Sequence, residues 1–475
     1  MKHPSIIQGG MGVAVSNYRL ARAVSKEGHL GVVSGTMLDT VLARRLQDGD
    51  PAGSLRRAIE KFPLPNIGES VLSNYFIDGG KDPAVPYKVV PMHGVHSPSA
   101  LIELTILANF VEVFLAKEDH DGVVGINYLT KIELPTLPSL FGAMLAGVDY
   151  VLMGAGIPRA IPAILQQLSK LETVVQKLDI LGSSSGDHCL QFDPRDYAPA
   201  ITELPLPYFL PIVSSSTLAQ ALLKKAVGKI DGFVVEHHRA GGHNAPPRGG
   251  ITLDDKGEPI YGMKDEIDTE AFCRLGLPFW LAGSCAHPDK LKEALQLGAQ
   301  GIQVGTAFAF CNESGILPSL KKEVITKVAK GEAEVFTDPR ASASGYPFKV
   351  VELDGSLSDK RIYENRTRIC DLGYLRTAYQ KEDGTVGFRC PGEPVDTYLR
   401  KGGSLEETDC RKCLCNGLMA TVGYAQVQKD GYKEPPLVTA GKELAFVADL
   451  LPAGRFDYSA KDVLNFLLKD NSNRP

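Results

Sequence analysis

Short apolar runs alternate with amphipathic stretches over the first 300 or so residues of this chain. Each amphipathic stretch carries apolar side chains at helical spacing, which is the pattern of repeated strand–helix units around a parallel sheet. Eight apolar runs can be counted, at residues 5–8, 30–34, 123–128, 150–153, 208–213, 232–236, 279–282 and 301–304. Runs such as 150–153 are continuously apolar, as expected for strands buried on both faces. Eight units in series predict a closed (β/α)8 TIM barrel rather than an open sheet.

The chain is longer than such a barrel requires. It has 475 residues, whereas a TIM barrel typically needs about 250. The surplus falls in a long insertion between the second and third strands, at about residues 50–120, and in a tail that follows the eighth strand. We therefore expect a barrel over residues 1–340 and a cysteine-containing C-terminal extension over residues 341–475, hereafter the tail. We interpret the insertion and the tail together as a lid and tail around one site, in which the tail is an extension or a lid.

Composition excludes several classes of protein. With 44% hydrophobic and 23% charged residues and a net charge of −5, the chain is typical of a globular protein rather than a disordered or nucleic-acid-coating one. Its most apolar stretch, residues 101–116, is interrupted by Glu103, Asn109 and Glu112, which argues against a membrane span. Without a signal-like N-terminus, and with nine unevenly spread cysteines, we expect a cytoplasmic protein with reduced thiols. The composition is compatible with a homo-oligomer.

The stretch from Glu236 to His243, after the sixth strand, has the strongest chemical signal. Active sites of such barrels lie where the strands end. Paired Gly241 and Gly242 let the backbone approach a flat ligand, and His243 beyond them is a candidate base. The alternatives are a glycine-rich turn with solvated histidines, or a zinc site made by His237, His238 and His243. Neighbouring histidines at a strand end are expected to point to opposite faces, which counts against zinc.

Glycines also follow the seventh and eighth strands. Barrels commonly bind phosphate through backbone N–H groups in these two loops. Gly283 and Gly305 stand at the matching positions, and Thr306 adds a hydroxyl. These residues predict a phosphate site, the alternative being simple turns.

Two further strand ends offer ring contacts. The first strand leads into Gly9-Gly10-Met11-Gly12, which is too short for a dinucleotide-binding motif, but its methionine could lie against an apolar ring system. A tight turn is the simpler interpretation. Asn127 and Lys131, near the end of the third strand, offer an amide and a cation to a ring or its hydroxylated chain, or else a surface role.

Together these loops resemble the nitronate monooxygenase family, also known as 2-nitropropane dioxygenases. These are FMN-dependent barrels related to flavin-containing enoyl-acyl-carrier-protein reductases. The resemblance covers roughly residues 4–310 and is carried in order by residues 6–12, 236–243, 281–284 and 298–306.

The resemblance implies a role for each matching residue. Gly10 and Met11 would pack on the flavin ring, Asn127 would contact it from the third strand, and Glu236 would make a polar FMN contact. Gly283, Gly305 and Thr306 would hold the phosphate, and His243 would be the catalytic histidine. The cofactor-binding residues it implies are Gly10, Met11, Asn127, Glu236, Gly241, Gly242, Gly283, Ser284, Gly305 and Thr306.

Some positions depart from the family pattern. Gly9-Gly10 replaces the more usual Pro or Ala before the methionine, and Ser284-Cys285 replaces a glycine-rich continuation. The bulky His237-His238-Arg239 and the stiff basic segment ending in Arg248 also differ. Candidate substrate-lining residues are His238, Lys131 and Arg248.

Five of the nine cysteines lie in the tail, at positions 370, 390, 410, 413 and 415. Cys410-x-x-Cys413-x-Cys415 resembles part of a metal-binding knuckle, which Cys390 or Cys370 could complete, although two well-spaced CxxC pairs are missing. A zinc or iron–sulfur site, reduced structural thiols and redox-active thiols all remain open.

The function expected from the resemblance is FMN-dependent oxidation of alkyl nitronates by O2 to carbonyl compounds and nitrite. The alternative is an FMN-dependent enoyl-thioester reductase, with NADH or NADPH as the reductant. A flavin-free barrel that acts as a binding protein is a third hypothesis.

Overall fold

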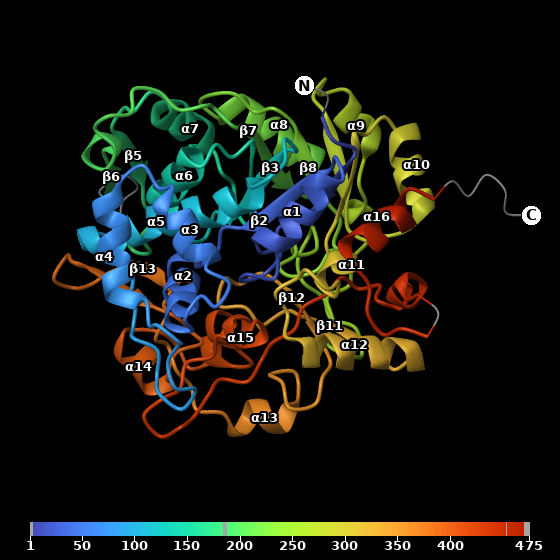
Figure 1. The fold of residues 1–475 in the computed structure, drawn as a ribbon. Helices are drawn as coiled ribbons and strands as arrows, with labels where there is room; N and C mark the ends of the chain where they lie inside the picture. Colours follow the sequence, from blue (N-terminus) through green and yellow to red (C-terminus); the bar gives the residue numbers. More distant parts are fainter. Residues whose placement is uncertain (1–2, 184–187, 453, 470–475) are drawn as a thin grey trace, which may run out of the picture.

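The predicted barrel is present in the computed structural model, which describes residues 3–183, 188–452 and 454–469 (Figure 1). Eight parallel strands close in the order β1-β2-β3-β4-β7-β8-β9-β10 and back to β1. Their bounds are β1 Ile6–Gln8, β2 Leu30–Ser34, β3 Val124–Leu129, β4 Tyr150–Gly154, β7 Tyr208–Val213, β8 Phe233–Glu236, β9 Phe279–Ala282 and β10 Gly301–Val304. Each predicted strand lies within a residue or two of its observed bounds, so the (β/α)8 fold is confirmed.

Apolar side chains from alternate strand positions fill the barrel. Ile7, Val32, Leu152, Val234 and Trp280 belong to one buried cluster inside it. The single tryptophan is fully buried, and its Nε1 donates to the Pro4 carbonyl at 2.8 Å. This packing closes one end of the barrel and leaves the carboxyl ends of the strands for a site.

Helices surround the strands. Up to residue 330 they are α1 Tyr18–Lys26, α2 Leu38–Gln47, α3 Ser54–Glu60, α4 Pro65–Tyr75, α5 Ser99–Lys117, α6 Thr136–Leu145, α7 Ile161–Ser169, α8 Ser216–Lys225, α9 Thr269–Cys273, α10 Pro288–Gln296, α11 Thr306–Ala309 and α12 Pro318–Lys330. By length and composition α5 could cross a membrane, but 72% of its apolar window is buried. It packs on α1, α2 and α6, which explains its apolar surface as that of an interior helix.

Two features of this region were not predicted. The insertion contains helix α4 Pro65–Tyr75, which our sequence analysis did not predict. The connection from α7 to β7 contains an antiparallel hairpin of β5 Val174–Lys177 and β6 Cys189–Phe192. Four-residue strands with one solvent-exposed face are too short to produce a clear periodic pattern in the sequence.

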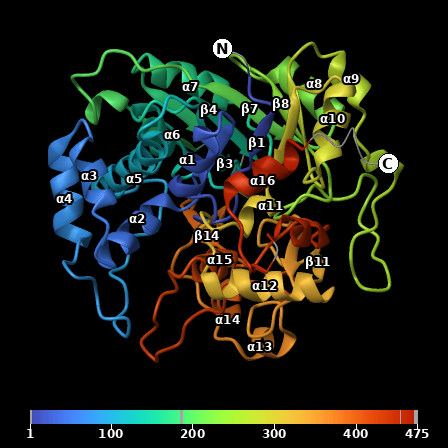
Figure 2. The same ribbon diagram turned by 45° about the vertical axis from the view of Figure 1, so that its right-hand side comes forward.

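The tail folds over one side of the barrel. It contains β12 Phe348–Val351, α13 Lys360–Asn365, β13 Thr377–Gln380, β14 Val386–Arg389, α14 Val395–Arg400, α15 Leu414–Thr421 and α16 Ala460–Leu467, and β12 pairs with β11 Val335–Asp338. A turn at residues 381–384 joins β13 to β14. Figures 1 and 2 show α13, α14 and α15 together below the barrel, whereas α16 returns to α1. The domain boundary at residue 340 stays a prediction.

Candidate active site

A cavity of about 430 Å³ opens at the carboxyl ends of the barrel strands. Its wall contains residues from the ends of all eight barrel strands, β1, β2, β3, β4, β7, β8, β9 and β10, and it is completed by residues of the tail. The structure brings the predicted catalytic histidine and all predicted cofactor-binding residues into this one wall. They are Gly10, Met11, Asn127, Glu236, Gly241, Gly242, His243, Gly283, Ser284, Gly305 and Thr306.

The three predicted substrate-lining residues do not line this cavity. Lys131 places its Nζ 5.7 Å from the ring centroid of Tyr346, whose side chain forms part of the wall. Arg248 donates from Nη2 to the carbonyl of Ser214 at 2.7 Å. His238 stacks on Tyr261, with ring centroids 4.1 Å apart. Lys131 and Arg248 contact the wall residues Tyr346 and Ser214 without lining the cavity themselves, and His238 is held by Tyr261 outside the wall, which sequence order could not indicate.

His243 is held by the tail. Its Nε2 lies 2.7 Å from the Oγ of Ser342, and its ring meets Phe348 edge-on at 4.9 Å. Burial lowers the pKa of His243 to about 4, because removal from water disfavours the imidazolium. The imidazole is therefore neutral at physiological pH and can accept or donate a hydrogen bond within the cavity.

An acid and a base, the half-buried Glu236 and the buried Lys349, lie beside the loop that carries His243. Burial raises the pKa of Glu236 to about 7, an effect that the nearby Lys349 ammonium opposes. Burial likewise lowers the pKa of Lys349 to about 7, with Glu236 opposing the shift. Lys349 donates from Nζ to the His238 carbonyl and to Oδ1 of Asn244. Our sequence analysis missed Lys349, although a lone lysine in the apolar run of β12 was a usable signal.

Three polar atoms in the cavity wall lack a partner. Asn127 Oδ1, Ser284 Oγ and Gln303 Oε1 are buried and accept or donate no hydrogen bond within the part of the chain that the structure describes. Ser284 also has a left-handed backbone, with φ of 54°, which is uncommon for a residue with a side chain. Buried polar groups normally have partners, so this wall is suited to a ligand with several polar edges.

The tail closes the cavity from above the loops. Thr439 accepts the Gly242 N–H through Oγ1 at 2.9 Å, and the Gly441 N–H donates to Thr306 Oγ1 at 2.8 Å. The tail therefore bridges the loops after β8 and β10 directly. None of the cavity-lining residues comes from the insertion at residues 50–120, so among the two additions to the barrel only the tail lines the cavity.

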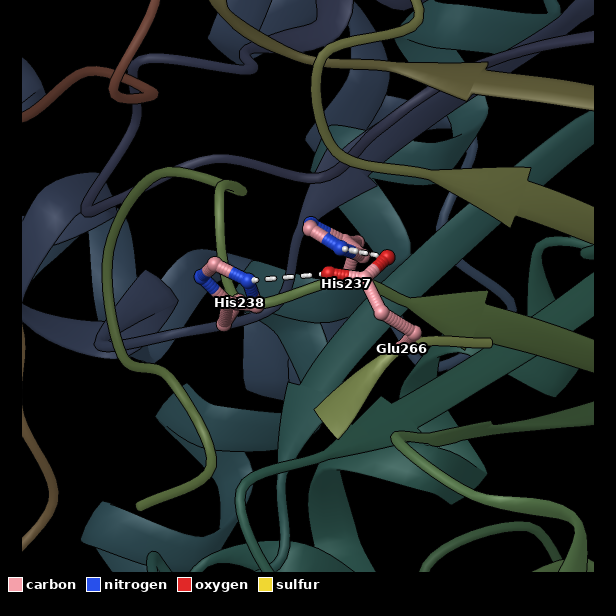
Figure 3. Close-up of side chains that lie close together, drawn as sticks. All are labelled: His237, His238 and Glu266. Atoms are coloured by element: carbon pink, nitrogen blue, oxygen red, sulfur yellow. Dashed lines mark hydrogen bonds and ion pairs between the residues drawn. The ribbon is translucent and has the colours of Figure 1, made fainter. Parts of the chain in front are cut away.

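The histidines after β8 correct another expectation (Figure 3). His237 and His238 do not point to opposite faces, because β8 ends at Glu236 and strand alternation ends with it. Their Nε2 atoms lie 3.2 and 3.9 Å from the two carboxylate oxygens of Glu266. These three side chains place their ligand atoms within 4.8 Å of one another, whereas His243 contacts Ser342 instead. A zinc site that includes His243 is therefore wrong.

Comparison with known proteins bears on the same region. Residues 196–352 match the family model for nitronate monooxygenase. Over this segment the chain is similar to nitronate monooxygenases. It contains β8, β9 and β10 and their loops, so the resemblance based on residues 236–243, 281–284 and 298–306 is confirmed.

Curated nitronate monooxygenases match over part of their length. The chain is 35% identical over 153 residues to a protein from Bacillus subtilis strain 168 named "Probable nitronate monooxygenase", and 29% identical over 154 residues to a nitronate monooxygenase from Pseudomonas aeruginosa. Each match covers 32% of this chain and 41% of the relative.

A solved structure agrees in fold over most of the chain. The enoyl reductase domain of MlnA from the macrolactin biosynthesis cluster of Bacillus amyloliquefaciens aligns with a TM-score of 0.50 and 10% identity. The alignment covers 98% of this chain and 92% of that domain. At this identity the likeness supports the barrel fold alone.

Proposed function

We propose that the protein is an FMN-dependent oxidoreductase that oxidises alkyl nitronates with O2 to carbonyl compounds and nitrite. The observation that carries the proposal is the wall of one cavity, where His243 and the glycine loops after β8, β9 and β10 meet Met11. The match of residues 196–352 to the nitronate monooxygenase family model supports the reaction class.

The cavity fits a flavin mononucleotide. A Cβ on Gly305 would lie 3.5 Å from Met11 Sδ, so the methionine and the backbone of the predicted phosphate loop share one part of the wall. The unpartnered Asn127 Oδ1, Ser284 Oγ and Gln303 Oε1 match a ligand that has a polar ring edge and a hydroxylated chain. Gly10, Met11 and Asn127 would hold the ring, and Gly283, Gly305 and Thr306 the phosphate.

His243 performs the protein's part of the reaction. When bound, FMN would accept the substrate's electron pair and deliver it to O2. A nitronate anion beside the neutral imidazole would favour its protonated form and raise the His243 pKa from about 4. His243 would then stabilise the anion, or accept the α-proton of a neutral nitroalkane, while Ser342 fixes the orientation of the ring.

The reaction is tested by measuring nitrite release under air from propionate-3-nitronate or 2-nitropropane. We expect turnover well above that of free FMN, and anaerobic bleaching of the bound flavin by nitronate alone. Bleaching by NADPH, without any by nitronate, would contradict the proposal and favour enoyl-thioester reduction. Protein that stays colourless after incubation with FMN would contradict the cofactor assignment.

The variant Ser284→Ala is expected to have opposite effects on FMN affinity and on the stability of the FMN-free protein. The variant removes a buried hydroxyl without a partner, so the FMN-free protein should be slightly more stable while FMN binds about 2–10-fold more weakly, because one net hydrogen bond contributes about 0.5–1.5 kcal/mol. FMN titration followed by fluorescence, together with thermal melts without flavin, measures both. Ser73→Ala on the exposed face of α4 is the matched control. Unchanged FMN affinity in Ser284→Ala would contradict this contact.

A further inference from the structure

Four of the five tail cysteines line one small pocket, away from the candidate active site. They are Cys370, Cys390, Cys413 and Cys415. All four are free thiols, and Cys413 and Cys415 are buried. The fifth, Cys410, does not line the pocket, and its Sγ donates to the carboxylate of Asp409 at 3.6 Å. Segments separated by up to 45 positions in sequence therefore bring four sulfur atoms to one place.

The surroundings of these sulfur atoms suit thiolates. Backbone groups at Gly392, Asn416 and Leu375 act to lower the pKa of Cys390, Cys413 and Cys415 respectively, because a nearby N–H favours the thiolate form. Asn416 adds a side-chain hydrogen bond from Nδ2 to the Cys413 Sγ at 3.5 Å. Arg376, which also lines the pocket, interacts electrostatically with Cys370, Cys390 and Cys415. Hydrogen bonds to sulfur and a nearby cation are the features that tune thiolate-bound metal centres.

Burial alone keeps the thiols protonated. It raises the pKa of Cys370, Cys390 and Cys413 to about 12, and that of Cys415 well above its ordinary value, with neighbouring thiols contributing in the same direction. A bound metal would reverse this effect, because a coordinating thiol loses its proton. The backbone donors and Arg376 then acquire partners with full negative charge.

The spacing of the sulfur atoms distinguishes a zinc site from an iron–sulfur cluster. Zinc binds thiolate sulfur at about 2.3 Å, so two ligands of one zinc ion are at most about 4.6 Å apart. Within the described ranges, only His237, His238 and Glu266 form a group of three ligand atoms that lie within 4.8 Å of one another. No three of the four sulfur atoms meet that limit, whereas an iron–sulfur cluster with four cysteine ligands holds at most two thiolates on any one iron and spans a larger site.

We propose that Cys370, Cys390, Cys413 and Cys415 bind an iron–sulfur cluster that joins the parts of the tail to one another. Each cysteine loses its proton to solvent on binding. Cys415 lies at the start of α15, and Leu418 and Thr421 on the same helix line the active-site cavity (Figure 1). The cluster therefore anchors the helix that forms part of the cavity wall.

Metal analysis of the full-length protein, purified without oxygen or chelators, tests this proposal. We expect iron and acid-labile sulfide in equal amounts, about two to four of each per chain, and a Mössbauer spectrum of clustered iron, which bound flavin does not obscure. Stoichiometric zinc without iron would overturn the proposal. Protein without iron that takes up none during anaerobic reconstitution with ferrous iron and sulfide would also overturn it.

Cysteine-to-serine variants test which cysteines are ligands of the cluster. Cys370→Ser and Cys413→Ser should each lower the iron and sulfide content by more than half, while Cys410→Ser, which alters a tail cysteine outside the pocket, should retain the wild-type content. Circular dichroism shows whether each variant is folded. Wild-type iron content in folded Cys370→Ser and Cys413→Ser, or loss in Cys410→Ser alone, would contradict the ligand set. Analysis of the wild-type protein keeps the proposal testable if a variant does not fold.

Discussion

Replacing His243 with glutamine is expected to lower kcat for nitronate oxidation by about 10²–10⁴-fold, the range typical of a lost general acid–base group. Glutamine can still hydrogen-bond the Oγ of Ser342, which lies 2.7 Å from Nε2, but it cannot exchange a proton. Bound FMN should therefore be retained. Steady-state nitrite release and the flavin content of the purified variant measure both effects.

The control for this variant is His96→Gln, which changes an exposed histidine in the insertion. It should leave kcat unchanged. Wild-type turnover in His243→Gln would show that His243 does not take part in the reaction. Loss of flavin from the same variant would indicate a role in cofactor binding instead.

The low pKa of His243 also predicts a pH dependence. Burial lowers the pKa from its ordinary value of 6.5 to about 4, so the folded protein binds fewer protons than the unfolded chain between these values. Above pH 6.5 His243 is neutral in both the folded and the unfolded chain, and the free energy of unfolding is unaffected by its titration. As the pH falls from 6.5 to about 4, the unfolded chain is protonated first, so the free energy of unfolding decreases. Denaturant unfolding from pH 7 to 4 should show a smaller acid destabilisation for His243→Gln than for wild type. An equal loss in both would contradict the assignment.

Replacing Lys349 with methionine is expected to have the largest effect on stability. The ammonium makes two hydrogen bonds, to the His238 carbonyl and to Asn244, and faces Glu236. Hydrogen bonds to charged groups contribute about 1.5–3 kcal/mol each, so the free energy of unfolding should fall by about 3 kcal/mol or more. The loop after β8 should also loosen, with weaker FMN binding. Denaturant unfolding and FMN titration measure these changes.

A double variant that also changes Glu236 tests whether the loss of stability comes from the pairing of Lys349 with Glu236. Removing the lysine leaves Glu236 buried without its cation, so adding Glu236→Gln to Lys349→Met should recover part of the lost stability. Lys330→Met, at the exposed end of α12, is the control and should be nearly neutral. A Lys349→Met protein as stable as wild type would show that the pair does not hold the loop.

Much of the site was predictable because barrel strands carry strong local signals. A strand buried on both faces must be continuously apolar, as in β4 Tyr150–Gly154. The order of units around a barrel follows the order in sequence, so residues at strand ends meet in one place. This is why Met11, Asn127 and His243 could be assigned to a single site before any contact was known.

Contacts made by the tail could not be predicted in the same way. Our expectation that His238 would line the cavity failed because the chain turns after Glu236 and stacks His238 on Tyr261. Lys349 and Ser342 reach the site from β12 and its preceding loop, more than 90 residues beyond their partners in sequence. Cys370, rather than Cys410, joins the other three cysteines.

The sequence by itself determined the barrel, its eight strands and the loops that form the floor of the cavity, because these depend on local burial patterns and on chain order. Only the tertiary structure decided that the tail and not the insertion closes the cavity, that Ser342 and Lys349 support His243 and its loop, and which cysteines meet. Those contacts join segments far apart in the chain, and no periodic pattern in the sequence encodes which distant surfaces pack together.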